Sequence, residues 1–572
     1  MSKNSSQSAQ RGMSRRNFLG LGAAAAGTAA VAGLAGCTPS SSEDAGSGSA
    51  SEDASDEEDW LGSEPEIAES EIVSSEDTEL LIIGAGAAGM VAAASAVDAG
   101  LDFIICDKNS ELTETREYVG AVNTMYTEAA GVEVDENKLL NEITRYASGK
   151  CKQEVIKVWI NESAELIEWL DPLMTAAGKT CELDVHDDEE TGGTDYYVPI
   201  LQHIYLPPYT EPMRNDILLS HIQDAGYDVR FSTEMVKLVH DDGPVTGAIF
   251  ETEDGYIQIN ATNTLLCTGG YAGNPTMMRA LQPDAVKCCT ANSYALQDTG
   301  DGIKAGIWAG GVKDVDAAPM IFDRGAVAPG TDAGYSDDSS SATFPGTIYQ
   351  TNIGSQPFMK VNRNGVRFAN ESTPYDFICF AAAKQPGGVW CQIFDGNAAD
   401  DVLRFSTIGC SAATAMYVRD YGLSIEEQLE SEIEAGYTQK ADTIDELADL
   451  LGFEGDAKEA FLDQVDRYNE LYEAQNDEDF GKEAYRLSAI SEPPFYGTWF
   501  GGSLLTTIDG LQIDGDMRVL DENGDPIEGL YAAGDVSGCW FANNYPEYIV
   551  GCASGRTMTE ARHVVRTLAG EL

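Results

Sequence analysis

The sequence predicts an α/β fold built on a parallel sheet, and two strands with the helix between them carry this prediction. Residues 80–83 are a short apolar run, Leu-Leu-Ile-Ile, that suits a strand buried on both faces. Residues 90–99 are rich in alanine, which favours a helix, and Gly100 ends it. Residues 103–106, Phe-Ile-Ile-Cys, follow as a second strand. Strand, helix and strand in this order form the unit from which parallel sheets are built.

A glycine-rich turn joins the first strand to the helix. Its glycines, Gly84, Gly86 and Gly89, have the G-x-G-x-x-G spacing of a dinucleotide-binding turn. In such a turn the first glycine allows the tight bend, the second lets the main chain approach a pyrophosphate, and the third lets helix and strand pack closely. The N–H groups at the start of the helix then face the phosphates. Asp107, at the end of the second strand, is placed to accept hydrogen bonds from ribose hydroxyls.

Length and charge narrow the classes of function. The chain has 572 residues, more than one ordinary core, so two or more domains are expected. A formal net charge of −60 would repel nucleic acid and anionic membrane surfaces, which excludes both as direct ligands. The 12 cysteines include no C-x-x-C pair and the 5 histidines no ligand-spaced pair, so neither haem attachment nor a metal site is expected.

The first 37 residues are predicted to be an export signal. Residues 14–19, Ser-Arg-Arg-Asn-Phe-Leu, match a twin-arginine signal, and a stretch of small apolar residues follows. Residues 34–37 resemble a lipobox, which would place a lipid anchor on Cys37; the alternative is an unmodified Cys37 in an uncleaved or conventionally cleaved signal. Residues 38–77 are acidic, without Lys or Arg, and are predicted to be a disordered linker. We therefore expect an extracytoplasmic lipoprotein that contacts the membrane only through its anchor.

The later elements suggest an interrupted domain. Helices are expected over residues 137–148, 153–170, 212–224, 301–309 and 456–475, with antiparallel strands over 227–259. Further strands are expected at 263–268 and 529–535, and a last helix begins near residue 555. The simplest architecture is a nucleotide-binding domain of residues 78–313 and 504–572, with residues 314–503 inserted as a capping domain that helps to form the substrate site.

Several motifs along the chain recur in one known family. Residues 265–270 resemble its "ATGG" strand, 300–302 its "GDG" helix start, and 529–535 its "GLYAAGD" strand. Residues 362–371 resemble "NxxGxRFxNE", and 468–470 with 479–482 resemble "YN…DxxFGK". Together with the glycine turn these motifs span essentially all of residues 78–572. The chain thus resembles the FAD-dependent fumarate reductase / 3-ketosteroid dehydrogenase flavoproteins.

The resemblance implies a Rossmann-like FAD-binding domain of the GR2 type with an inserted α+β capping domain. Substrate would lie between the cap and the isoalloxazine. Asp535, at a strand end, would bind the ribityl or ribose part of FAD, and the last helix would point its N-terminus at the flavin N1–C2=O edge. The implied cofactor-binding residues are Gly84, Gly86, Ala87, Ala88, Gly89, Asp107, Lys108, Gly120, Thr268, Gly269, Asp301, Gly534 and Asp535.

Four positions depart from the fumarate reductases of that family. Ala318 and Thr506 stand where those enzymes have histidines. Tyr545 replaces a clamping arginine, and Tyr375 replaces the arginine that donates the proton. A dicarboxylate would lose its charge-assisted partners, so fumarate and succinate are not expected as substrates. Tyr375 and Tyr545 resemble instead two active-site tyrosines of the 3-ketosteroid dehydrogenases, although Ile549 replaces a carbonyl-binding glycine and weighs against a steroid.

The expected function is reduction of an activated C=C bond, of the enone or enoate type, in a small neutral or mono-anionic molecule. Hydride would pass from flavin N5 to the β-carbon, Tyr375 would protonate the α-carbon, and Tyr545 would polarise the activating carbonyl. No nicotinamide site is evident, so electrons are expected from an external donor, a membrane-linked cytochrome or quinol dehydrogenase. Two alternatives stay open: the reverse reaction, as a ketone dehydrogenase, and a non-catalytic flavin electron carrier.

Overall fold

The computed structural model describes residues 59–572, apart from 114–115, 184–195, 209, 241–242, 293–294, 348–350, 413, 416–417, 420–421 and 423. The predicted export signal, with the lipid attachment at Cys37, lies outside the described residues. By their contacts, Glu58–Leu572 form one unit. Within it we distinguish a nucleotide lobe, which holds the glycine turn, and a cap lobe, which holds a second sheet.

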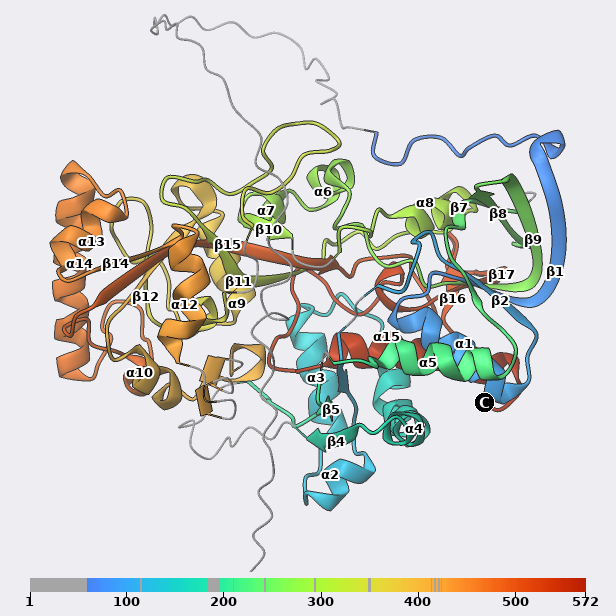
Figure 1. The fold of residues 1–572 in the computed structure, drawn as a ribbon, viewed down its shortest axis with the longest axis horizontal. Helices are drawn as coiled ribbons and strands as arrows, with labels where there is room; N and C mark the ends of the chain where they lie inside the picture. The colour runs from blue at the N-terminus through green and yellow to red at the C-terminus, as the bar shows by residue number, and fades with distance from the viewer. Residues whose placement is uncertain are drawn as a thin grey trace, which may run out of the picture. The chain divides into compact units, whose positions relative to one another are not determined.

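The main sheet of the nucleotide lobe is parallel at its centre. Its order is β17 (Pro526–Ala532), β9 (Gly255–Leu266), β1 (Ile72–Ile83), β2 (Phe103–Cys106) and β6 (Val229–Arg230), each parallel to the next. The antiparallel β16 (Arg518–Leu520) closes one edge. Helix α1 (Ala87–Ala99) packs against α5 (Arg214–Asp224) and α15 (Cys552–Leu568) beside the sheet (Figure 1). The predicted α/β fold is confirmed.

The start of β1 corrects the predicted linker. Residues 59–77 were expected to belong to a disordered tether, yet β1 begins at Ile72 and pairs with β9 from Ile72↔Tyr256 onward. The first residues of the strand are mostly exposed, so their acidic side chains can stay in solvent while the strand forms. The main chain pairs with β9, and Arg230 forms an ion pair with Glu76. A strand held by its backbone and surface charges gives no apolar signal in the sequence.

Antiparallel strands and several helices complete the nucleotide lobe. β7 (Glu234–Leu238), β8 (Gly247–Thr252) and β9 are antiparallel neighbours, which confirms the prediction for residues 234–259, whereas β6 at the start of the predicted range is parallel to β2. A small sheet contains β3 (Tyr118–Gly120), β5 (Gln202–Leu206) and β4 (Thr180–Leu183). The remaining helices are α2 (Met125–Ala129), α3 (Glu136–Tyr146), α4 (Gln153–Ala176), α6 (Pro275–Leu281), α7 (Pro283–Val286) and α8 (Asp301–Trp308).

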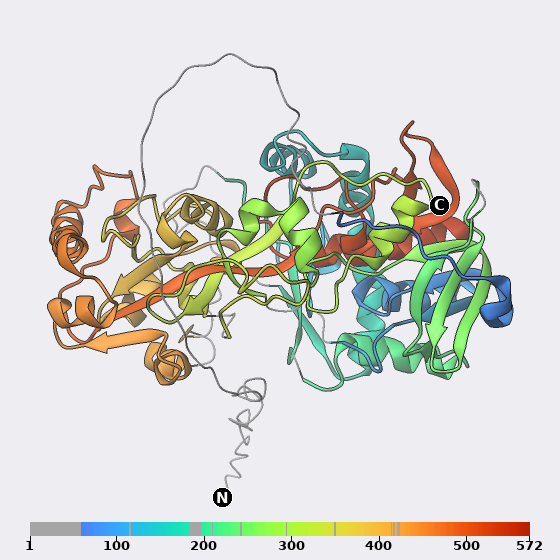
Figure 2. The ribbon, with the colours of Figure 1, turned by 90° about the horizontal axis from the view of Figure 1, so that it is seen from above.

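One long strand organises the cap lobe. β15 (Phe495–Thr507) is buried throughout and pairs with β10 (Cys289–Asn292), β11 (Pro319–Val327), β13 (Trp390–Phe394) and β14 (Thr438–Ala441), while β12 (Met359–Val361) pairs with β13. Its helices with described bounds include α9 (Tyr375–Ala382), α10 (Ala398–Arg404), α12 (Ile425–Glu434), α13 (Ile444–Leu450) and α14 (Gly455–Ala474). Figure 2 shows β15 running from the cap lobe toward the nucleotide lobe. The sheet therefore begins before and ends after the predicted cap segment of residues 314–503.

Charged residues of the cap motifs form a buried cluster. Arg367 donates hydrogen bonds to Glu371 and to Asp477, with Nε and Nη2 each 2.8 Å from a carboxylate oxygen. Lys482 Nζ lies 3.4 Å from Glu371 and 2.6 Å from the hydroxyl of Tyr468. All five side chains are buried. Buried charges persist when they are paired and hydrogen-bonded, so these motif residues hold the cap lobe together rather than a ligand.

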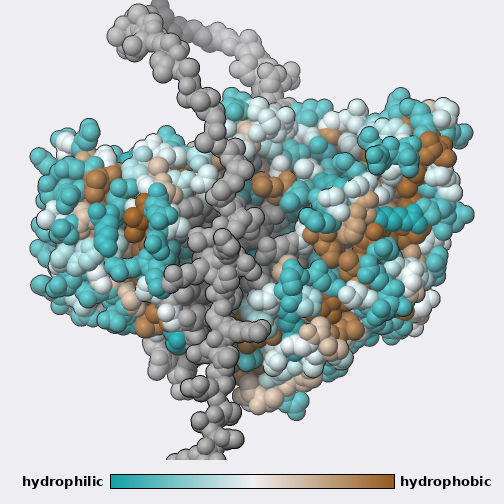
Figure 3. All heavy atoms as spheres, in the orientation of Figure 1, coloured by the Kyte–Doolittle hydropathy of each residue, from teal (hydrophilic) through white to brown (hydrophobic). Residues whose placement is uncertain are grey.

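No helix among the described residues is both long and apolar enough to cross a membrane. On the face drawn in Figure 3, hydrophobic residues of both lobes are interspersed with hydrophilic ones.

Candidate active site

A cavity of about 330 Å³ lies at the carboxyl ends of the parallel strands. Ile83 of β1, Cys106 of β2 and Ala533, just beyond β17, line it from the nucleotide lobe. Met320 and Phe322 of β11 line it from the cap lobe. Ligands of open α/β sheets bind at this edge, and the volume is within the range of small-molecule pockets.

The glycine turn forms one wall of the cavity. Its three glycines differ in what a side chain would meet there. Gly84 has φ +102°, and a Cβ there would lie 2.4 Å from the carbonyl oxygen of Cys267. A Cβ on Gly89 would lie 1.8 Å from the carbonyl oxygen of Gly84. A Cβ on Gly86 would meet no protein atom within 4 Å, although Gly86 lines the cavity at the N-terminus of α1. The open space at Gly86 suits a pyrophosphate, because nothing of the protein fills it.

Asp107 and Lys108 follow β2 at the cavity wall. The Asp107 carboxylate accepts hydrogen bonds from the Ala85 N–H at 2.6 Å and from the Asn109 main-chain and side-chain nitrogens at 2.8 and 2.9 Å. Asp107 thereby ties the glycine turn to the end of β2. Lys108 Nζ lies 2.7 Å from Asp301, so these two predicted cofactor residues form an ion pair with each other.

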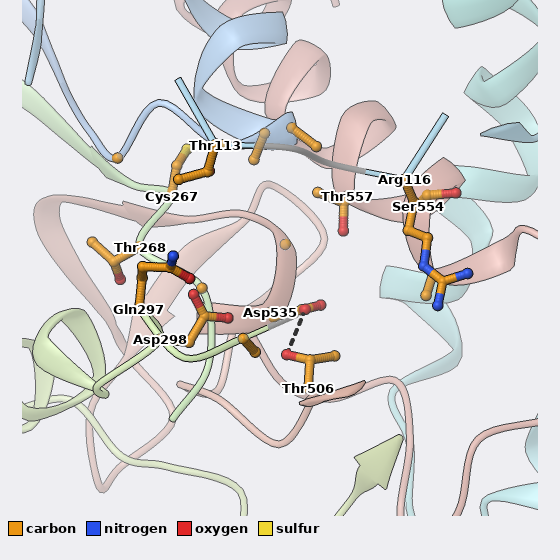
Figure 4. A pocket seen from close by; sticks show the side chains of 18 of the residues that line it. Thr113, Arg116, Cys267, Thr268, Gln297, Asp298, Thr506, Asp535, Ser554 and Thr557 are labelled. Atoms are coloured by element: carbon orange, nitrogen blue, oxygen red, sulfur yellow. Dashed lines mark hydrogen bonds between the residues drawn. The ribbon is translucent and has the colours of Figure 1, made fainter. Parts of the chain in front are cut away.

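Two aspartates, Asp535 and Asp298, form an acidic wall of the same cavity. Asp535 accepts a hydrogen bond from the Thr506 hydroxyl at 2.9 Å, the dashed line in Figure 4, and lies 3.5 Å from Arg556. Burial raises the pKa of Asp535, and the Arg556 charge opposes the rise. Asp298, which the sequence analysis did not select, also lines the cavity. Burial, and then the charge of Asp535, raises the pKa of Asp298 to about 7. Its place just before the Gly-Asp-Gly motif was the one available signal.

The opposite end of the cavity is mostly apolar. Phe322, Cys410 and Tyr545 line it, together with Arg116, whose guanidinium lies 5.3 Å from the centre of the Phe322 ring. Figure 4 shows Arg116 on the side across from Asp298. Burial raises the pKa of the Tyr545 phenol well above its usual value, and the neighbouring Cys552 thiol adds to the rise. Arg116 could not be predicted as a site residue, because it lies in a loop that contains no motif.

Most of the predicted site residues reach this cavity, and three do not. Gly89 packs helix α1 against its own turn. Gly120 lies behind the wall, where its N–H donates to the Gly551 carbonyl at 3.0 Å. Tyr375 is buried, with its ring packed edge-to-face on Phe322 at 4.7 Å between centroids. The residues that line the cavity are Gly84, Gly86, Ala87, Ala88, Asp107, Lys108, Thr268, Gly269, Asp301, Gly534, Asp535 and Tyr545.

Residues 79–547 match the family described as the FAD binding domain. The chain belongs to this family. A vinyl phenol reductase of Lactiplantibacillus plantarum is 25% identical over 506 residues, which cover 85% of this chain and 96% of that protein. An open conformation of a flavocytochrome c3 fumarate reductase matches 87% of this chain and 78% of its own, with a TM-score of 0.64 and 25% identity. A 3-ketosteroid Δ1-dehydrogenase from Sterolibacterium denitrificans has the same fold, with a TM-score of 0.64 and 18% identity over 87% of this chain and 100% of its own.

FAD is therefore the cofactor, and the cavity fits it. The space at Gly86 is open to phosphates, and Asp107 and Asp535 offer carboxylates for hydroxyl groups. The Thr268 hydroxyl lines the cavity and is buried without a hydrogen-bond partner among the described residues. Because buried polar groups normally form hydrogen bonds, this hydroxyl indicates a contact with a ligand. The protein is an FAD-dependent oxidoreductase.

Proposed function

We propose that this protein reduces an activated C=C bond in a small neutral or mono-anionic substrate. FAD, held by the glycine turn and by Asp535, would supply the hydride. The observation that carries the proposal is the chemistry of the cavity end opposite the acidic wall, where Phe322, Met320 and Tyr545 lie beside Arg116. Arg116 and Lys108 are the basic residues among the described residues that line the cavity, and Lys108 forms an ion pair with Asp301. A single guanidinium beside an apolar wall suits a substrate with one negative charge or none.

Two tyrosines would complete the reaction. Tyr545 lies in the cavity wall, where its phenol can donate a hydrogen bond to the carbonyl or other group that activates the double bond. Tyr375 lies behind Phe322, outside the cavity lining, and would donate the proton to the α-carbon once the Phe322 ring moves aside. Burial raises the pKa of Tyr375 well above its usual value, and nearby Cys410 and Glu547 add to it, so the phenol stays protonated until carbanion character develops at substrate.

Reoxidation of the reduced enzyme tests the proposal directly. Under anaerobic conditions the reduced flavin should be reoxidised by enones, enoates or vinyl-substituted phenols, and the fastest compound defines the substrate class. A low flavin midpoint potential would fit reduction. A high potential would favour the reverse dehydrogenase reaction, for which the resemblance of Tyr375 and Tyr545 to ketosteroid dehydrogenase tyrosines is the supporting observation. If no compound reoxidises the flavin, the protein is an electron carrier and the proposal is wrong.

The place of action and the electron source follow from the N-terminal sequence. We propose export by the twin-arginine pathway and attachment by a lipid on Cys37, on the strength of residues 14–19 and 34–37. For an exported flavoprotein, a membrane-linked cytochrome or quinol dehydrogenase would be the electron donor. Mass spectrometry of the mature N-terminus, with and without lipase treatment, would check the anchor.

Arg116 should select for one negative charge on the substrate. Arg116→Gln is expected to raise KM for a mono-carboxylate enoate about 10- to 100-fold, the loss expected for a charge-assisted hydrogen bond of about 1.5–3 kcal/mol. The methyl ester of the same compound should keep its KM. Steady-state kinetics with the matched acid and ester would measure both.

The control for this variant is Arg279→Gln. Arg279 also stacks on an aromatic ring, 5.1 Å from the centre of Tyr335, but does not line the cavity. Equal losses for acid and ester in Arg116→Gln, or loss of FAD from that variant, would contradict a role in recognising the substrate charge.

A further inference from the structure

A buried carboxyl group connects the two tyrosines of the proposed reaction. Glu547 is 4% exposed and lies two residues after Tyr545, in the segment between β17 and α15. The segment belongs to the nucleotide lobe, whereas Tyr375 begins α9 of the cap lobe. Glu547 does not line the cavity, and no motif in the sequence marks it.

Both oxygens of this carboxyl group bond to the cap lobe. Oε1 accepts a hydrogen bond from the Tyr375 N–H at 3.0 Å, and Oε2 accepts one from the Ser411 hydroxyl at 2.7 Å. The Glu547 carbonyl oxygen also accepts from the Cys410 N–H at 3.4 Å. A Cβ on Gly409 would lie 2.6 Å from the same carbonyl oxygen, so the two chains approach closely here. One residue thus joins the start of α9, the 3₁₀ turn Gly409–Ala412 and the C-terminal segment.

The start of α9 depends on this contact. Tyr375 is the first residue of the helix, and Pro374 before it provides no side-chain cap. The N–H groups at the beginning of a helix have no partner within the helix and need one from outside. Glu547 supplies it from the other lobe. The Cα of Tyr375, and with it the direction of the phenol, is therefore set by a side chain that moves with Tyr545.

We propose that Glu547 is a positioning residue that fixes the Tyr375 end of α9, behind Phe322, against the Tyr545 side of the cavity. The inference rests on the proposed function, because it assigns Tyr375 and Tyr545 to one reaction. Removing the carboxyl group should misplace Tyr375. The FAD site should stay intact, because it lies at the carboxyl ends of the parallel strands of the nucleotide lobe. A misplacement of about 1 Å can lower a rate about 100-fold.

The surroundings of Glu547 also predict a dependence on pH. Burial raises the pKa of Glu547 to about 8; the Ser411 hydrogen bond opposes the rise, and the charges of Asp323 on β11 and Asp376 on α9 add to it. Tyr146 of α3 and Tyr196 also face this charge, and Tyr146 donates to both oxygens of Asp376 at 2.9 Å. The hydrogen bonds from the Tyr375 N–H and the Ser411 hydroxyl are accepted by the carboxyl oxygens in either protonation state, so they persist above pH 8. Ionisation of Glu547 above that pH instead places a negative charge near the Tyr375 phenol, which raises the pKa of that phenol further and makes it a weaker acid, so kcat should fall.

The test compares Glu547→Ala and Glu547→Gln with wild type, on the panel compound that wild type reduces fastest. Alanine should lower kcat about 100-fold with a small change in KM and full FAD content. Glutamine keeps an acceptor for the Tyr375 N–H and gains a donor for Ser411, so it should recover most of the lost kcat. Glutamine cannot ionise, so its pH profile should lack the fall near pH 8. Hydrogen exchange at the start of α9 should be faster in the alanine variant than in the glutamine variant.

Glu432 offers the matched control. It is a buried glutamate of α12 that accepts from the Thr351 and Ser431 hydroxyls, burial raises its pKa, and it does not line the cavity. Glu432→Ala and Glu432→Gln should leave kcat and the pH profile unchanged. An unchanged kcat in Glu547→Ala, or a fall near pH 8 that persists in Glu547→Gln, would overturn the inference. If wild type reduces no compound of the panel, the proposed function fails; unchanged α9 exchange in Glu547→Ala would then overturn the positioning role separately.

Discussion

Tyr375→Phe is expected to lower kcat about 10²- to 10⁴-fold, the usual contribution of a general acid, while the protein keeps its FAD. The substitution removes one hydroxyl group and leaves the ring that packs on Phe322. Steady-state turnover with the best panel compound measures the loss, and the flavin absorbance of the purified protein measures the bound FAD. A solvent isotope effect present in wild type and lost in the variant would assign the missing step to proton transfer.

The native environment of this hydroxyl makes the variant a clean test. The Tyr375 hydroxyl is buried and has no hydrogen-bond partner among the described residues. Removing it therefore leaves no donor or acceptor unsatisfied, and the free energy of unfolding should change little. A large fall in melting temperature would mean that the loss of turnover reports folding instead.

Tyr335→Phe is the control for this prediction. Tyr335 also has a buried hydroxyl without a partner among the described residues, and its ring packs on another aromatic ring, Phe344, at 4.2 Å. It does not line the cavity and does not pack on a residue that the reaction is proposed to use. The control should keep wild-type kcat. Equal turnover of Tyr375→Phe and the control would exclude Tyr375 as the proton donor.

The nucleotide lobe could be predicted because its signals are local. The apolar run of β1, the glycine turn and Asp107 lie within about 30 residues, as they do in any βαβ unit of this kind. The exposed start of β1 could not be predicted, since an acidic strand paired through its backbone has the composition of a tether. The predicted boundaries of the cap differ from the observed extent of the cap sheet for a related reason. The single strand β15 serves the cap sheet and runs on past residue 503, so no change of composition marks the end of the cap.

Most of the residues that the sequence predicts for FAD line one cavity, whereas the opposite end of that cavity, apart from Tyr545, was not predicted. The predicted residues belong to motifs with fixed spacing, but the opposite end is assembled from loops and strands far apart in the chain. Arg116 and Phe322 meet at 5.3 Å, and Glu547 meets the Tyr375 N–H at 3.0 Å. No sequence period relates such pairs, because the fold alone brings them together. Motif reasoning also assigned Gly120 to the cofactor, whereas its N–H bonds to Gly551 behind the wall.

Gly86→Val should give a folded protein that does not hold FAD. The φ of Gly86 is −74°, which suits any residue, and its Cβ position meets no protein atom within 4 Å. The valine would instead occupy the space through which the pyrophosphate approaches the N-terminus of α1. We expect the affinity for FAD to fall more than about 1,000-fold, which corresponds to about 4 kcal/mol. Titration of the apoprotein with FAD, followed by flavin fluorescence, measures it.

Variants at two further glycines distinguish a clash with the ligand from a clash within the protein. Gly515→Val is the matched control, because a Cβ there also meets no protein atom within 4 Å and the residue does not line the cavity; it should bind FAD as wild type does. Gly89→Val should fail to fold, since its Cβ would lie 1.8 Å from the Gly84 carbonyl oxygen. A Gly86→Val protein that melts like wild type and is colourless would place the pyrophosphate at this turn. A yellow Gly86→Val protein with wild-type affinity would place the cofactor elsewhere and remove the basis for the whole site.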